Sequence, residues 1–109
     1  MANLAIKTAL SLVTPGVYYS DEMENVTYID IQAIPSVGAT GQVNYTVQRK
    51  TTNGDWRTAT DPYGVALKFQ TVNAANGGIT LDGLYARYLR VKIEVLGGTG
   101  TVTVETEII

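Results

Sequence analysis

The segment Gln42–Lys50, QVNYTVQRK, carries the clearest structural signal in this chain. Its apolar residues Val43, Tyr45 and Val47 recur at every second position, and polar residues fill the positions between them. A period of two places alternate side chains on opposite faces of a β-strand. One face is then buried and the other meets water, which is typical of a strand in an antiparallel sheet.

Alternation of the same kind extends outward in both directions from this strand. Val26–Ala33 and Tyr85–Leu96 predict further strands, and Leu4–Val13 predicts a strand with a helix as its alternative. Shorter strands are expected at Val17–Tyr19 and Thr101–Ile109. The residues expected to face the core are Ile29, Ile31, Val43, Tyr45, Val47, Val65, Leu67, Phe69, Leu89, Val91, Ile93, Val95, Val102 and Val104.

Turn signals separate these strands at short intervals. Asn53-Gly54 predicts a type I′ hairpin, because both residues tolerate a positive φ. Further turns are predicted at Asp61–Gly64, at Asp82-Gly83, which separates a short strand at 79–81 from the strand at 85–96, and at Gly97–Gly100. About eight strands with such turns predict an all-β fold, a single antiparallel β-sandwich that is jelly-roll-like. A closed up-and-down barrel is the alternative.

Length and composition restrict the chemistry. The chain has 109 residues, with neither His nor Cys, which predicts one domain over residues 1–109. Within it, residues 1–25 are either a docking arm or an edge strand. The missing side chains exclude disulfides and Ser-His or Cys-His catalysis and remove the commonest zinc ligands. We therefore expect no enzymatic activity, no cofactor and no metal, although Asp21, Glu22 and Glu24 could contact Ca²⁺ without an EF-hand spacing.

Charge is distributed unevenly along the chain, although the net charge is only -2. Residues 1–40 and 101–109 are acidic overall, and residues 41–100 are basic. Such a layout suits copies that meet each other or an oppositely charged lattice, and equally a solvated surface of mixed sign. We expect no nucleic-acid partner at this net charge. We expect no membrane partner either, because the longest apolar run, Ala9–Val13, is too short to span a bilayer.

Four segments support a resemblance to a known family. Gln48-Arg49-Lys50 is followed by Asn53-Gly54-Asp55-Trp56, then by Leu84-Tyr85-Ala86-Arg87-Tyr88-Leu89-Arg90-Val91, and Gly97–Val104 closes the chain. Over residues 40–106 this order resembles small discoidin-like, or galactose-binding-like, β-sandwich domains. It is most similar to the Cys-free versions encoded in structural gene clusters of tailed bacteriophages. Lys50–Asn53 departs from the family's Ser-x-Asp hairpin, and the sugar-binding loops cannot be matched.

The resemblance implies a non-enzymatic virion protein, most similar to capsid cement or decoration proteins that bind the major capsid protein lattice. It would be made in the bacterial host cytoplasm and act on the capsid surface. Homo-oligomers, including trimers, would suit icosahedral positions, and many weak contacts would add up by avidity. The alternatives are a neck or tail component, or a carbohydrate-binding module on a fibre or tail tip with exposed aromatics at Trp56, Tyr63 and Tyr85.

Candidate partner-binding residues follow from interface composition, in which Tyr, Trp, Met and Arg are enriched. Trp56 has a second interpretation as a partly buried anchor at the end of the sheet. Arg87 and Arg90 have a second interpretation as partners of carboxylates on neighbouring strands. The predicted contact residues are Tyr18, Tyr19, Met23, Trp56, Tyr88 and Arg90.

Overall fold

A computed structural model describes residues 4–109, and the side chains of residues 9–109. All of its regular structure is β-strand, which confirms the all-β prediction. No helix within the described residues is long and apolar enough to cross a membrane. The strands are β1 (Leu4–Ser11), β2 (Gly16–Tyr19), β3 (Met23–Pro35), β4 (Thr40–Lys50), β5 (Arg57–Thr58), β6 (Lys68–Val72), β7 (Gly77–Thr99) and β8 (Thr101–Ile108).

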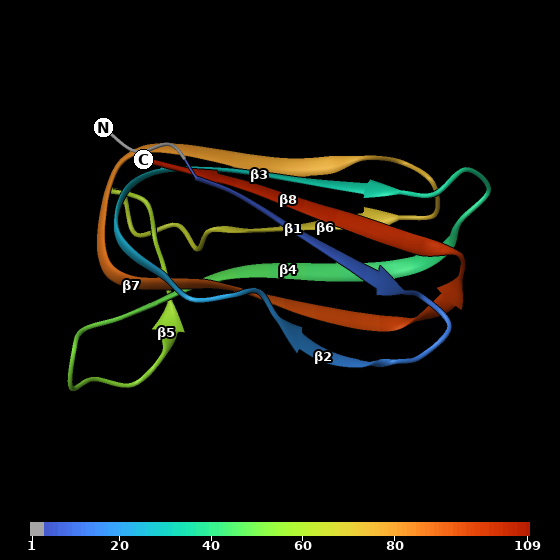
Figure 1. The fold of residues 1–109 in the computed structure, drawn as a ribbon, viewed down its shortest axis with the longest axis horizontal. Helices are drawn as coiled ribbons and strands as arrows, with labels where there is room; N and C mark the ends of the chain where they lie inside the picture. Colours follow the sequence, from blue (N-terminus) through green and yellow to red (C-terminus); the bar gives the residue numbers. More distant parts are fainter. Residues whose placement is uncertain (1–3) are drawn as a thin grey trace.

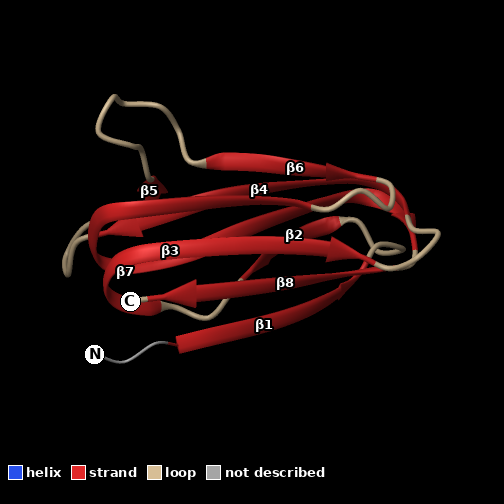
Figure 2. Ribbon diagram, turned by 90° about the horizontal axis from the view of Figure 1, so that it is seen from above, coloured by secondary structure: helices blue, strands red, loops and turns tan. Residues whose placement is uncertain are grey.

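These eight strands form one antiparallel sheet in the order β1-β8-β3-β7-β4-β5, with β2 paired to β7 and β6 paired to β4. The sheet curls strongly on itself into a half-barrel around a single core (Figure 1). One layer contains β1, β8 and β3, and the other contains β2, β4 and β6, as Figure 2 also shows. The predicted antiparallel strands and layered core are therefore confirmed, with the layers joined as parts of one curled sheet.

The long strand β7 belongs to both layers. Its first part, from Gly77 to Leu89, pairs with β3, and its second part, from Tyr88 to Thr99, pairs with β4, so the two stretches overlap at Tyr88 and Leu89. The predicted chain reversal at Asp82-Gly83 is wrong, because β7 continues through it. Gly83 has a φ of 82°, and the pairing with β3 shifts register between Val26 and Tyr28. A single left-handed glycine here produces a bulge and a bend.

The predicted type I′ hairpin at Asn53-Gly54 is also wrong. The turn lies one residue earlier, because the Gly54 amide donates to the Thr51 carbonyl at 3.2 Å. Neither Asn53 nor Gly54 has a positive φ. Gly54 thus occupies the last turn position, where type I turns favour glycine. The chain returns to the sheet at β5, so residues 51–56 form a projecting loop that includes Trp56 (Figure 1).

Most residues expected in the core are buried, because the strands alternate as predicted. The residues expected in the core on β3, β4, β7 and β8 are all 0–2% exposed. Val65 is an exception and is 60% exposed. It lies in the Asp61–Gly64 turn region, where its amide donates to Asp61 Oδ1, and β6 begins only at Lys68. The helix alternative for Leu4–Val13 is wrong, since β1 pairs with β8 at one end of the sheet.

Tyr45 on β4 is the largest fully buried side chain among the described residues. Its ring stacks on Phe69, with ring centres 4.5 Å apart and planes 11° apart. Its hydroxyl lies 2.9 Å from Thr71 Oγ1, which is also buried. The buried hydroxyl of Tyr45 therefore has a hydrogen-bond partner inside the core, as buried polar groups that do not contact water require.

The buried phenol gives a testable pH dependence. Burial raises the pKa of Tyr45 above its ordinary value of 10.0, and the hydrogen bond with Thr71 offsets part of the rise. Above pH 10 the unfolded chain loses this proton while the folded chain keeps it. We therefore expect the free energy of unfolding to fall as pH rises from about 10 toward the folded pKa. Urea unfolding across this range should show a shallower fall for Tyr45→Phe; equal slopes would contradict the assignment.

Candidate functional site

The outer surface of one layer carries most of the polar and aromatic side chains that the sequence singled out. Residues at every second position of β7 point away from the core here, beside outward residues of β4 and β2. We call this surface the β2–β7–β4 face. Its cross-strand rows are Tyr88 with Lys50, Arg90 with Gln48, Lys92 with Thr46 and Tyr19, and Glu94 with Asn44 and Val17.

Cations and aromatic rings alternate along one end of this face. Arg90 lies between two rings, with its Cζ 4.0 Å from the Tyr19 ring centre and 4.2 Å from the Trp56 ring centre. Lys50 Nζ lies 5.2 Å from the Trp56 ring centre and 5.5 Å from that of Tyr88. Arg87 Cζ lies 5.1 Å from the Tyr88 ring centre. We call the series Tyr19, Arg90, Trp56, Lys50, Tyr88 and Arg87 the cation–aromatic ladder.

Sheet pairing and one loop bring the ladder together. Lys50 lies directly opposite Tyr88, and Tyr19 is opposite Lys92, the next outward residue after Arg90. Trp56 reaches the face because the turn at residues 51–54 folds the chain back toward β5. Each contact places a cation over the negative face of a ring, which contributes roughly 0.5–2 kcal/mol depending on exposure.

Amide groups, not carboxylates, accept the hydrogen bonds of the two arginines. Arg90 Nε donates to Gln48 Oε1 at 2.8 Å, and Arg87 Nη1 donates to Asn25 Oδ1 at 2.9 Å. Within the side chains that the structure describes, no carboxylate hydrogen-bonds to either guanidinium, so the predicted carboxylate pairing is wrong. The amides orient the cations without neutralising them. A guanidinium held between rings is thus preorganised to bind a carboxylate from outside.

The structure gathers four of the predicted contact residues, Tyr19, Trp56, Tyr88 and Arg90, into the ladder. The interpretation of Trp56 as a partly buried anchor also holds, since it is half-buried against the cations. Lys50 was not among the predicted contact residues. Its place at the end of a predicted strand, just before a turn signal and Trp56, was the clue in the sequence.

Two other predicted contact residues lie elsewhere. Met23 as a surface contact is wrong: it is 2% exposed in the core, because β3 starts at this residue and pairs it with Leu89. Tyr18 points to the other side of β2 from Tyr19 and is half-buried against the core. Its hydroxyl donates to the Thr14 carbonyl at 3.2 Å.

Exposed apolar side chains continue the β2–β7–β4 face beyond Tyr19. Val17 and Leu96 are 46% and 51% exposed. Val17 shares the outward side of β2 with Tyr19, and Leu96 follows Glu94 on the outward side of β7. We call these two residues the apolar rim. The face therefore has an apolar end and a cationic, aromatic end.

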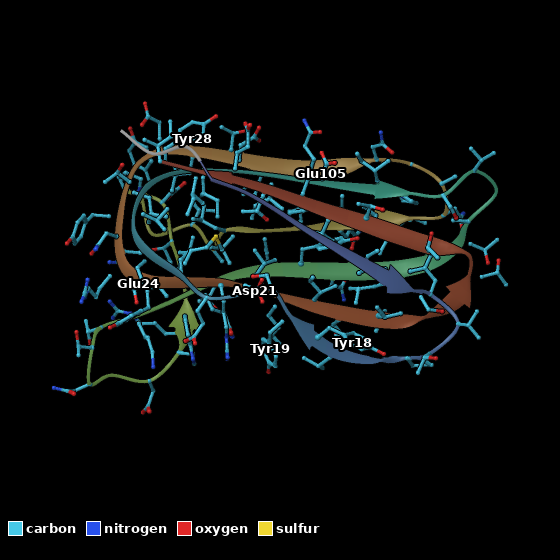
Figure 3. The ribbon with its side chains drawn as sticks, viewed as in Figure 1. Tyr18, Tyr19, Asp21, Glu24, Tyr28 and Glu105 are labelled. Atoms are coloured by element: carbon cyan, nitrogen blue, oxygen red, sulfur yellow. The ribbon has the colours of Figure 1, made fainter. Side chains whose placement is uncertain are left out.

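Acidic side chains lie near the ladder without forming a metal site. Figure 3 shows Asp21 and Glu24 on the same side of the molecule as Tyr19. Among the described residues, no group of three or more acidic side chains is placed to hold a metal ion.

The three aromatics expected on a carbohydrate platform are not assembled into one. Trp56 lies in the ladder, beside a shallow hollow lined by Thr51, Asp55 and Arg57. Tyr85 lines a separate hollow of about 220 Å³ with Arg49 and Asp61. Tyr63 is 91% exposed and lines neither hollow.

No protein-family model matches this chain, and no curated protein matches it in sequence. Solved structures do share its fold. PirA is 14% identical with a TM-score of 0.58, over 92% of this chain and 90% of that one. A protein of Bacillus endospore appendages, described as disulfide-linked pili, is 14% identical with a TM-score of 0.55, over 98% and 86%.

The SPBc2 prophage-derived protein YomS is 17% identical with a TM-score of 0.50, over 96% of this chain and 94% of that one. Likenesses at such low identity show the fold alone. The chain therefore has a small all-β curled-sheet fold that is shared by these proteins and is specific to no one family.

Proposed function

We propose that this protein is a non-enzymatic structural protein of a tailed-bacteriophage particle, a capsid cement or decoration protein that binds the major capsid protein lattice. The observation that carries the proposal is the β2–β7–β4 face, where a partly exposed ladder of Trp, Tyr, Lys and Arg adjoins the apolar rim. Such aromatic and Arg side chains beside apolar contacts are the chemistry of protein interfaces. The discoidin-like motifs and the fold shared with a prophage-derived protein support the virion setting.

The same face favours docking over catalysis. Its cations are held by rings and amides on an outward sheet surface, so no enclosed site exists here for a reacting group to be shielded from water. Docking needs only shape, an apolar contact and complementary charge on the partner. On a lattice, many such contacts add up, and a homo-oligomer would increase the gain.

The edge strand β1 offers a second contact of a different kind. It pairs with β8 alone in the described sheet, so its other edge can accept a strand from a neighbour. Because β1 and β2 are integral to the sheet, deleting residues 1–20 would remove strands of the fold itself. Point substitutions on the ladder are the cleaner test.

We expect Trp56→Ala combined with Arg90→Ala to weaken binding to phage particles by at least about thirtyfold, because interface hot spots of this kind contribute about 2 kcal/mol or more. Particles stripped of the protein are mixed with purified protein, and the bound fraction is measured after sedimentation. Electron microscopy of re-bound particles separates a head position from a neck or tail position.

Tyr63→Ala is the matched control, since it removes an exposed ring that makes none of the ladder's cation–ring contacts, and it should bind as the wild type does. Recovery of the protein only as free molecules, absent from every particle, would overturn the virion role. Normal binding by the double variant would remove the ladder from the docking surface.

A carbohydrate-binding role on a fibre or tail tip remains a second candidate, favoured by one observation. A hollow of about 520 Å³ over β4, β6 and β7 is lined by groups that can bond sugar hydroxyls, among them Gln42, Asn44, Gln70 and Glu94. These groups already bond one another, as in the 2.9 Å contact from Gln42 Nε2 to Asn44 Oδ1. Glycan-array binding that is lost in Asn44→Ala would favour this role over a capsid contact.

A further inference from the structure

The outer surface of the opposite layer carries a pair of facing carboxylates. Asp30 on β3 lies directly opposite Glu107 on β8, whereas Glu105, two residues before Glu107, lies opposite Lys7 of β1. We call this surface the β3–β8 face. Like charges directly opposite on neighbouring strands repel each other, so a cation brought from outside would be favoured here. The Thr80 hydroxyl donates to Asp30 Oδ1 at 2.7 Å, which orients that carboxylate without neutralising it.

A shallow trough runs beside these acids. It has a volume of about 390 Å³ and is lined by consecutive residues of β3, from Asp30 to Ile34, and by the start of β7 from Asn76 to Thr80. Ile34 in this trough is 38% exposed. The β3–β8 face thus joins carboxylates to a hollow with an exposed apolar side chain, into which a protruding side chain can fit.

The two faces are complementary in charge. Asp30 and Glu107 lie opposite each other on neighbouring strands of one face, and Arg90 and Lys92 are two residues apart on β7 in the other. Opposite residues on neighbouring strands are roughly 4.5–5.5 Å apart and alternate residues on one strand are roughly 6.5–7 Å apart, so each cation can reach one carboxylate. An aromatic ring or a rim side chain beside the cations would then meet the exposed Ile34 in the trough beside the acids.

The faces also lie on opposite sides of the molecule, because each points away from the shared core. Figure 3 shows this plainly, with Glu105 and Tyr19 at opposite sides of the view. In a two-fold dimer, both faces of one copy would have to contact the partner at the same time. Two faces on opposite sides of the molecule cannot do this. They produce a head-to-tail contact, which builds rows or rings.

We propose that copies of this chain associate head to tail, with the cation–aromatic ladder of one copy seated on the β3–β8 face of the next. This inference rests on the ladder being a docking surface, and it names a second copy of the chain as the occupant. In a row, the copy at one end keeps its ladder for the capsid. Glu24 lies opposite Tyr88 of the ladder and keeps the attraction moderate. The contact depends on salt, because ions screen the charges that meet in it.

The test uses purified protein without particles, so its outcome is independent of capsid binding. Sedimentation velocity at about 20 mM and about 500 mM salt should show concentration-dependent association at low salt that weakens at high salt. Two neutral double variants break one face each. Arg90→Gln with Lys92→Gln alters the ladder side, and Asp30→Asn with Glu107→Gln alters the acidic side, without creating a charge that could pair anew.

Each double variant alone should associate at least about tenfold more weakly than the wild type. A one-to-one mixture retains one intact ladder and one intact β3–β8 face per pair, so it should form dimers and nothing longer. Glu22→Gln is a control that removes one charge at an exposed site outside the paired rows of both faces, and it should associate as the wild type does.

Three outcomes would overturn the head-to-tail contact. The wild type could stay monomeric at low salt up to about 1 mM, the concentration scale of weak contacts. The double variants could associate as strongly as the wild type while remaining folded by circular dichroism. Alternatively, the mixture could form no dimers although the wild type associates, which would show that the two faces do not meet.

Discussion

Gly98→Ala should lower the free energy of unfolding by at least about 3 kcal/mol, among the largest losses that one methyl group can cause. Gly98 on β7 pairs with Gly41 on β4, and the two backbones approach more closely here than side chains allow. A Cβ on Gly98 would overlap the Thr40 carbonyl oxygen and lie 2.9 Å from Gly41 Cα. Both obstacles are backbone atoms, so relief requires the two strands to separate.

The matched control is Gly38→Ala. Gly38 also has a left-handed φ, +77°, but nothing lies within 4 Å of the added Cβ. It should therefore cost only the conformational penalty, roughly 1–2 kcal/mol. Urea unfolding followed by circular dichroism compares the two variants, and equal losses would contradict the close strand approach at Gly98.

Tyr45→Ala should cost about 3–5 kcal/mol, as large-to-small substitutions of buried aromatic residues do. The substitution removes a ring that is stacked on Phe69 and leaves a cavity in the core. It also leaves the buried Thr71 hydroxyl without the partner that now lies 2.9 Å away.

Tyr45→Phe separates these contributions, since it keeps the ring and its stacking and removes only the hydroxyl. Its loss should be about 1–3 kcal/mol, the cost of leaving one buried polar group unpaired. Thermal and urea unfolding measure both variants. If Tyr45→Phe were as damaging as Tyr45→Ala, the hydrogen bond with Thr71, and not packing, would dominate this part of the core.

The sequence was sufficient for the strands that are buried on one side only. Val43, Tyr45 and Val47 alternate with polar residues, and this period alone identifies the strand and its inward face. The connections between strands were harder to predict, because the same dipeptide can occur in different backbone geometries. Asp82-Gly83 has the composition of a turn, yet β7 pairs with β3 both before and after it, so the dipeptide forms a bulge and the strand continues.

The candidate site was predictable in its residue types but not in its assembly. Tyr19, Trp56, Tyr88 and Arg90 were chosen because interfaces favour such residues. Their stacking depends on which strands become neighbours, and β2 contacts β7 across more than 70 residues of sequence. Met23 was misplaced for a related reason: it was chosen by residue type, whereas its pairing with Leu89 makes it the buried first residue of β3.

The pairing order described above also has a consequence for synthesis on the ribosome. β2 hydrogen-bonds only to β7, β1 only to β8, and β3 only to those two strands, so within the described chain none has a partner before Gly77. The nascent chain therefore carries three unpaired, partly apolar segments until its last third emerges. During that interval they are open to association with other nascent chains or to protection by a chaperone. Production in quantity would accordingly depend on how fast the ribosome delivers β7.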